Sequence, residues 1–69
     1  MKTINGVDVG SRLRELRGDR SQKEVADALG VTPMAISQYE RGERIPNDDM
    51  KIALAKFFKK SVTSIFFAQ

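Results

Sequence analysis

The sequence predicts an all-α fold of five helices within one small domain, residues 1–69. Apolar residues recur three and four positions apart over most of the chain, as they do on the buried face of a helix. Several segments begin with a residue type that caps helices, and two of them end at a glycine. No segment has the strict alternation of apolar and polar residues that would indicate a strand. The helices are taken below in chain order.

Residues 1–8 predict a short N-terminal arm, because they show little periodicity and contain a turn-like Asn-Gly pair. Asp8 or Ser11 can cap a first helix, which is expected to run to about Arg17. Apolar residues spaced three and four apart form the stripe that this helix would bury: Val9, Leu13 and Leu16.

Residues 21–41 predict two short helices joined by a tight turn. Ser21, with a glutamate three residues later, forms a capping box and so begins a helix. Gly30 can end that helix, because glycine adopts the left-handed conformation without steric cost. Thr32 can cap the second helix, and Pro33 fits its first turn, where no backbone N–H is needed.

The steep crossing of two such helices requires a very small side chain at the contact, and Ala26 is placed to provide it. The segment therefore predicts a helix-turn-helix. Its core-facing residues are Val25, Leu29, Val31, Ile36 and Tyr39. The second helix is left with one exposed side, which consists of Pro33, Met34, Ser37, Gln38 and Arg41.

Two further helices complete the expected fold. Asn47 can cap a fourth helix, whose first turn carries two aspartates that suit the positive end of the helix dipole. Ser61 can cap a last short helix over residues 62–67. The fourth helix has an apolar stripe at Met50, Ala53, Leu54, Phe57 and Phe58, widened by Ile52 and Ala55.

The spacing of several residues in and around the helix pair resembles the phage repressor/Cro and xenobiotic-response-element (XRE) class of DNA-binding domains. These residues are Gln22, Ala26, Gly30, Val31, Ile36, Ser37, Glu40, Gly42 and Pro46, and the match spans about residues 9–67. The resemblance implies a compact lambda-repressor-like fold. It also implies a sequence-specific regulator, here expected to be a repressor, that binds an inverted-repeat operator as a homodimer with helix 32–41 in the major groove.

The same resemblance implies which side chains contact DNA. The base-facing positions would be Pro33, Met34, Ser37 and Gln38, and the phosphate-contacting positions Gln22, Lys23, Thr32, Arg41 and Arg44. Gln38 is the most specific of these, because a carboxamide can pair with adenine N6 and N7. Met34 suits a thymine methyl, although packing against its own helix is an open alternative. Relatives often carry glutamines at two of these positions, so the operator sequence cannot be inferred from them.

The resemblance extends to an ion pair and to the C-terminal helices. Arg17 is similar to a first-helix arginine that pairs with a glutamate after the reading helix, here Glu40. Four phenylalanines lie between residues 57 and 67, more than so small a domain can bury. Core packing is expected of Phe58, Ile65 and Phe66. Phe67 would be an exposed ring unless a second subunit covers it, so a dimer interface is expected at Phe67 and Phe66.

Composition excludes most other functions. The chain has a net charge of +3 and lacks cysteine and histidine, so thiolate or zinc sites and the commonest general base are absent. We expect no enzyme activity, no cofactor and no metal. No apolar run approaches the ~18 residues of a membrane span, so a cytoplasmic protein is expected, without a small-molecule effector domain. The four lysines within residues 51–60 and the arginines flanking the helix pair are the sources of positive charge.

A protein-interaction module is the alternative, for instance an antitoxin-like domain that binds another protein through its Phe-rich C-terminal helices. The exposed side of residues 33–41 is largely neutral and polar, which suits base edges better than an apolar protein contact. RNA binding is a weaker third hypothesis, because exposed aromatic rings for base stacking are missing.

Overall fold

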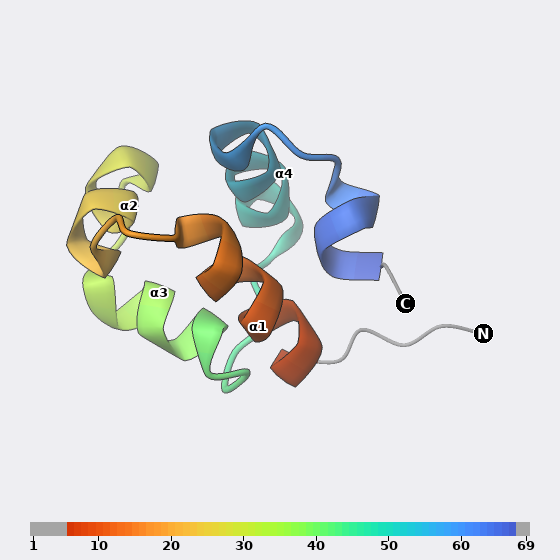
Figure 1. The fold of residues 1–69 in the computed structure, drawn as a ribbon, viewed down its shortest axis with the longest axis horizontal. Coiled ribbons are helices and arrows are strands. Elements are labelled where there is room, and N and C mark those ends of the chain that lie inside the picture. Colours follow the sequence, from red (N-terminus) through yellow and green to blue (C-terminus); the bar gives the residue numbers. More distant parts are fainter. Residues whose placement is uncertain (1–5, 68–69) are drawn as a thin grey trace.

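The computed structural model describes residues 6–67, which form four α-helices and one π-helical turn (Figure 1). The elements are α1 (Gly6–Arg17), α2 (Gln22–Leu29), α3 (Pro33–Glu40), α4 (Asp48–Phe58) and η1 (Thr63–Phe67). No strand occurs among these residues, and the predicted all-α fold with five helical elements is confirmed. None of the helices in this part of the chain is long and apolar enough to cross a bilayer.

Helix α1 begins earlier than the sequence predicts. It starts at Gly6, so residues 6–8 are helical, and Asp8 lies in the first turn. The expected arm of residues 1–8 is therefore wrong for its last three residues, and the rest of it lies outside the described residues. Gly6 lies against the backbone just beyond α3, since a Cβ at this position would be 2.8 Å from the carbonyl oxygen of Gly42.

The helix-turn-helix forms as its capping residues predict. The Ser21 hydroxyl accepts a hydrogen bond from the N–H of Glu24 at 3.0 Å, and the Thr32 hydroxyl accepts one from the N–H of Ala35 at 3.1 Å. Between the two helices, Gly30 takes a left-handed conformation, with φ +72° and ψ +29°. Ala26 is completely buried, which confirms the small residue expected in this helix pair.

One apolar core joins all five elements. Its members are Val9, Leu13, Val25, Ala26, Ala35, Ile36, Tyr39, Leu54, Ala55, Phe58, Ile65 and Phe66. Ile52, expected to widen the stripe of α4, is instead 47% exposed. Side chains two positions apart in an α-helix point in directions that differ by about 200°. Because Leu54 faces the core, Ile52 faces solvent.

The last element is capped as predicted but is a π-helical turn, not an α-helix. The Ser61 hydroxyl accepts a hydrogen bond from the N–H of Ser64 at 3.0 Å. The wider turn buries the consecutive residues Ile65 and Phe66 together, at 1% exposure each. Phe66 therefore has no surface to offer a second subunit, and its assignment to a dimer interface is wrong. Phe67 is 40% exposed.

Candidate nucleic-acid interface

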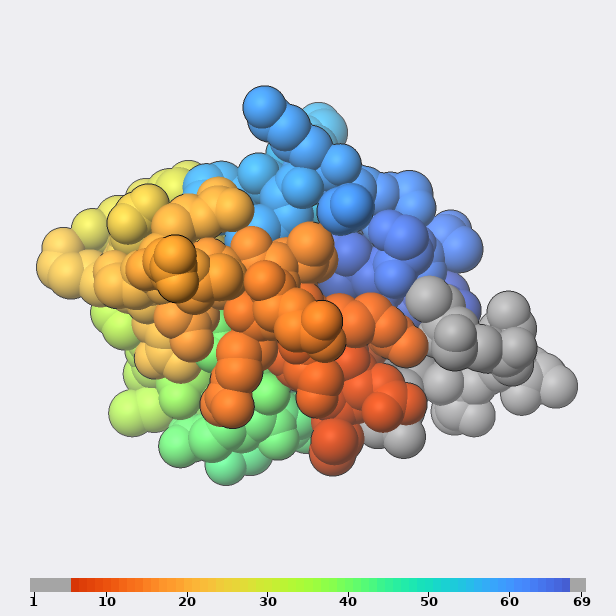
Figure 2. All heavy atoms as spheres, in the orientation of Figure 1, coloured from red at the N-terminus to blue at the C-terminus, as the bar shows by residue number. Residues whose placement is uncertain are grey.

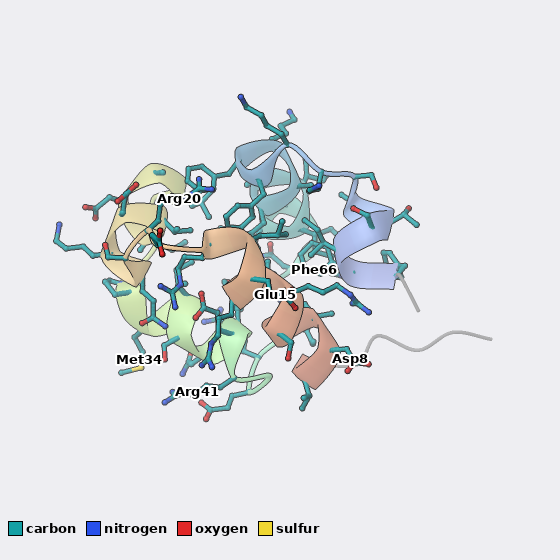
Figure 3. All side chains as sticks on the ribbon, in the orientation of Figure 1. Asp8, Glu15, Arg20, Met34, Arg41 and Phe66 are labelled. Atoms are coloured by element: carbon teal, nitrogen blue, oxygen red, sulfur yellow. The ribbon has the colours of Figure 1, made fainter. Side chains whose placement is uncertain are left out.

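The predicted reading side of α3 faces away from the core. Met34 is 62% exposed and Pro33 is also exposed, while Ser37 and Gln38 are half-buried. Figure 3 shows Met34 and Arg41 directed outward at the lower edge of the molecule. Burial of Ile36 and Tyr39 fixes this orientation, because those two residues hold the opposite side of α3 in the core. Exposure of Met34 argues against its packing on its own helix.

This side of α3 offers hydrogen-bonding groups that the protein itself does not use. Among the residues that the structure describes, neither the Ser37 hydroxyl nor the Gln38 carboxamide has a hydrogen-bond partner. A helix of this kind fits the major groove of B-DNA, where each base pair presents its own donors, acceptors and methyl groups. The surface is therefore chemically suited to base edges.

The predicted phosphate contacts surround α3, but most of them have a partner within the protein. Lys23 pairs with Asp27 at 2.8 Å, and the hydrogen bond to that carboxylate raises the pKa of Lys23. Arg41 pairs with Glu43 at 3.1 Å. Arg44 lies 5.8 Å from the centroid of the Tyr39 ring and, within residues 6–67, forms no ion pair. Its charge is therefore the least compensated of the three.

A buried carboxylate ties the end of α3 to the two preceding helices. Glu40, the last residue of α3, accepts hydrogen bonds from Arg17 Nε at 2.6 Å and Nη2 at 3.1 Å. The Glu40 side chain is only 2% exposed, against 19% for Arg17, so the predicted pair is confirmed and is partly buried. These bonds raise the pKa of Arg17, so the stabilisation is complete below the ordinary arginine range and is lost only at higher pH.

Gln22 completes this cluster. Its Nε2 donates to Glu40 Oε1 at 3.0 Å, from the first residue of α2. This bond, which the sequence did not predict, holds the side chain next to the N-terminus of α2. We call Arg17, Gln22 and Glu40 the Glu40 cluster. It joins α1, α2 and α3 through one carboxylate and so sets how the reading helix is held.

Gly10 also helps to position α3, and this role was not predicted from the sequence. A Cβ at this position would overlap the Glu40 carbonyl oxygen and would lie 2.7 Å from its carbon and 2.8 Å from the Tyr39 oxygen. The backbones of α1 and α3 therefore touch at Gly10. The available signal was a glycine inside a helical pattern, where it costs roughly 1 kcal/mol relative to alanine and so indicates a close approach.

Two other arginines of residues 12–20 lie close to groups of the protein itself. Arg20 donates to the Leu16 carbonyl oxygen at 3.3 Å and lies over the rings of Phe57 and Phe58, 5.2 and 5.5 Å from their centroids. Arg14 is 65% exposed, with its Nε 3.9 Å from the Glu40 carboxylate.

Comparisons with known proteins agree with this geometry. A family model described as helix-turn-helix matches residues 11–65. The HTH-type transcriptional regulator DicA of Escherichia coli K12 is 35% identical over 69 residues, which cover 97% of this chain and 50% of DicA. The chain thus spans about half the length of that curated relative.

Two solved structures are similar in both fold and sequence. The P22 c2 repressor protein, crystallised in complex with a synthetic operator, is 33% identical with a TM-score of 0.81; the match covers 84% of this chain and 91% of that one. The restriction-modification controller protein C.AhdI from Aeromonas hydrophila is 31% identical with a TM-score of 0.78, over 87% and 94% of the two chains.

Proposed function

The chain belongs to the helix-turn-helix family, in its phage repressor/Cro-like (XRE) branch, and we propose that it represses transcription by placing α3 in the major groove of duplex DNA. The observation that carries the proposal is the exposed side of α3, where the Ser37 and Gln38 polar groups have no partner within residues 6–67. The operator complex of the similar P22 c2 repressor supports it. The activity needs no catalytic group or cofactor, and it would take place in the cytoplasm.

Base readout would come from Pro33, Met34, Ser37 and Gln38. The Gln38 carboxamide is the group that can make paired hydrogen bonds to adenine, and the exposed Met34 offers apolar contact to a thymine methyl. Phosphate contacts would come from Gln22, Lys23, Thr32, Arg41 and Arg44, with the N-terminus of α2 as a further anion site. DNA would compete with Asp27 and Glu43 for Lys23 and Arg41.

Replacing Gln38 with alanine is expected to remove base discrimination at one operator position. The loss on the preferred sequence should be about 1–3 kcal/mol, because a paired contact to one base disappears. Binding to the DNA upstream of the protein's own gene, compared with single-base variants of it, measures the change. An unaltered sequence preference would show that the assigned reading side is wrong.

Replacing Arg44 with alanine should weaken binding to all sequences alike. The slope of log affinity against log salt should fall by about one unit, as expected when one phosphate contact is lost. Gel shifts at several salt concentrations test this. Lys56→Ala is the matched control, since it removes an exposed cation from α4. An equal loss of DNA affinity in both variants would show that Arg44 acts only through the net charge of the protein.

We also propose a two-fold homodimer that covers the Phe67 ring. This ring is 40% exposed at the end of η1, and the Lys51 amine lies 5.7 Å from its centroid. A dimer would set its two α3 helices about 34 Å apart, one turn of DNA, so the operator would be an inverted repeat. Sedimentation that shows only monomer at tens of micromolar would contradict the dimer while leaving groove binding intact.

A further inference from the structure

A hollow of about 250 Å³ lies where α1, η1 and the segment after α4 meet, and DNA reading makes no use of it. Arg12, Glu15, Leu16, Lys60, Ser64 and Ile65 line it. Figure 2 shows this face, where α1 (orange) runs beside the blue C-terminal elements. Leu16 and Ile65 are the two apolar residues of the lining, and charged side chains make up most of the rest. The shape and lining suit a single apolar side chain held among ionic contacts.

The rim carries mainly positive charge. Lys60 is exposed and has no ion pair within the described residues, and the same is true of its neighbour Lys59. Arg12 donates through Nη1 to the Ile65 carbonyl oxygen at 2.8 Å, which fixes its guanidinium beside the hollow. Residues 50–67 contain no acidic residue, and Glu15 is the one acid in the lining. A partner with carboxylates would complement this rim.

Lys59 has an unusual backbone conformation for a residue with a side chain. Its φ of +58° lies in the left-handed region. The chain places glycine at the three other positive-φ positions in the described part, Gly18, Gly30 and Gly42. A left-handed conformation costs roughly 1–2 kcal/mol for residues other than glycine. A lysine thus stands at the C-cap of α4, a position where glycine would be less strained.

We propose that this surface binds an acidic peptide segment of a partner protein. One apolar side chain of the segment fills the hollow between Leu16 and Ile65, and its carboxylates face Lys59 and Lys60. DNA fits less well, because the phosphate backbone has no apolar group for the hollow.

The position of this surface allows peptide and operator to bind together. In Figures 1 and 3, α4 and η1 lie at the upper right, whereas the labelled α3 residue Met34 lies at the lower left. A partner bound at the hollow would therefore leave the reading side of α3 accessible. The inference adds protein recognition to DNA binding and does not depend on it.

The test is fluorescence polarisation of the full chain with labelled peptides of Glu and Asp that carry one central Leu, Ile or Phe. Saturable, salt-sensitive binding is expected. It should be lost when Ser replaces the central residue, or when Gln and Asn replace the acids. Lys59→Gly and Lys60→Ala should each weaken binding up to about fivefold, the range for an exposed ion pair. Arg14→Ala, which removes one charge elsewhere on α1, should leave it unchanged.

The Lys59→Gly variant separates a binding role from a structural one. Its melting temperature should equal or exceed that of the original protein, because glycine accepts the left-handed conformation, while its peptide affinity falls. Absence of saturable binding by any of the peptides, or equal binding by the Lys59→Gly and Lys60→Ala variants, would overturn the proposal. The proposal would also be overturned if Lys59→Gly weakened binding of a short non-operator DNA duplex as much as it weakened binding of the peptide. That result would assign the surface to nucleic acid. Gln38→Ala should leave peptide binding intact, so the two proposals fail separately.

Discussion

Replacing Gly10 with alanine should destabilise the domain by about 3 kcal/mol, the upper end of the usual cost of overpacking. The added methyl group would overlap the Glu40 carbonyl oxygen and lie 2.7 Å from the Glu40 carbonyl carbon. Both obstacles belong to the backbone of α3, so no side-chain rotation can relieve them. Helix α1 must move away from α3, and the burial of Val9 and Leu13 would suffer with it. For a domain of this size, the melting temperature should fall by more than about 10 °C.

Urea denaturation of three variants would show whether the contact has this cost. Ser11→Ala changes an exposed neighbour on the same helix and should shift stability by less than about 0.5 kcal/mol. Gly30→Ala has no atom within 4 Å of the new Cβ but a φ of +72°, so it should cost only about 1 kcal/mol. A Gly10→Ala loss no larger than that of Gly30→Ala would mean that α1 and α3 can separate easily.

Local signals explain how much of the fold could be predicted from the sequence. The hydroxyls of Ser21, Thr32 and Ser61 each cap the expected element, because a cap needs only a donor three residues away. The exposed side of α3 could be predicted equally well, because residues outside the buried stripe of a helix must face solvent. Features set within one or two turns of chain were therefore predictable.

Apart from the Arg17–Glu40 pair, which the family resemblance implied, contacts between distant segments were not predictable. The start of α1 at Gly6, against the backbone of Gly42, was not expected, and neither was the exposure of Ile52 on the side of α4 opposite the buried Leu54. Phe66 is buried in a π-helical turn, which no pattern in the sequence predicted. The same limit applies to the candidate site, where the bond from Gln22 to Glu40 joins residues 18 positions apart.

Replacing Arg17 with methionine should cost about 3 kcal/mol of folding stability. The loss falls at the lower end of the range for breaking a buried ion pair, because Arg17 is 19% exposed. The variant leaves the Glu40 carboxylate with the hydrogen bond from the Gln22 amide and with the largely exposed Arg14, whose Nε lies 3.9 Å away. Equilibrium urea denaturation at neutral pH measures the loss. A loss below about 0.5 kcal/mol would indicate a solvated pair of little consequence.

The double variant Arg17→Met/Glu40→Leu separates stability from positioning. Removing both charges leaves no unpaired carboxylate, and apolar replacements of buried pairs are often neutral, so most of the lost stability should return. The tie from Glu40 to Gln22 is absent in this variant as well, and α3 keeps only its apolar contacts and the approach at Gly10. If the Glu40 cluster positions the reading helix, the double variant should fold normally yet bind the operator about tenfold more weakly, equivalent to 1.4 kcal/mol. Full operator affinity in a well-folded double variant would show that the cluster contributes to stability alone, and that packing suffices to hold α3 in its reading position.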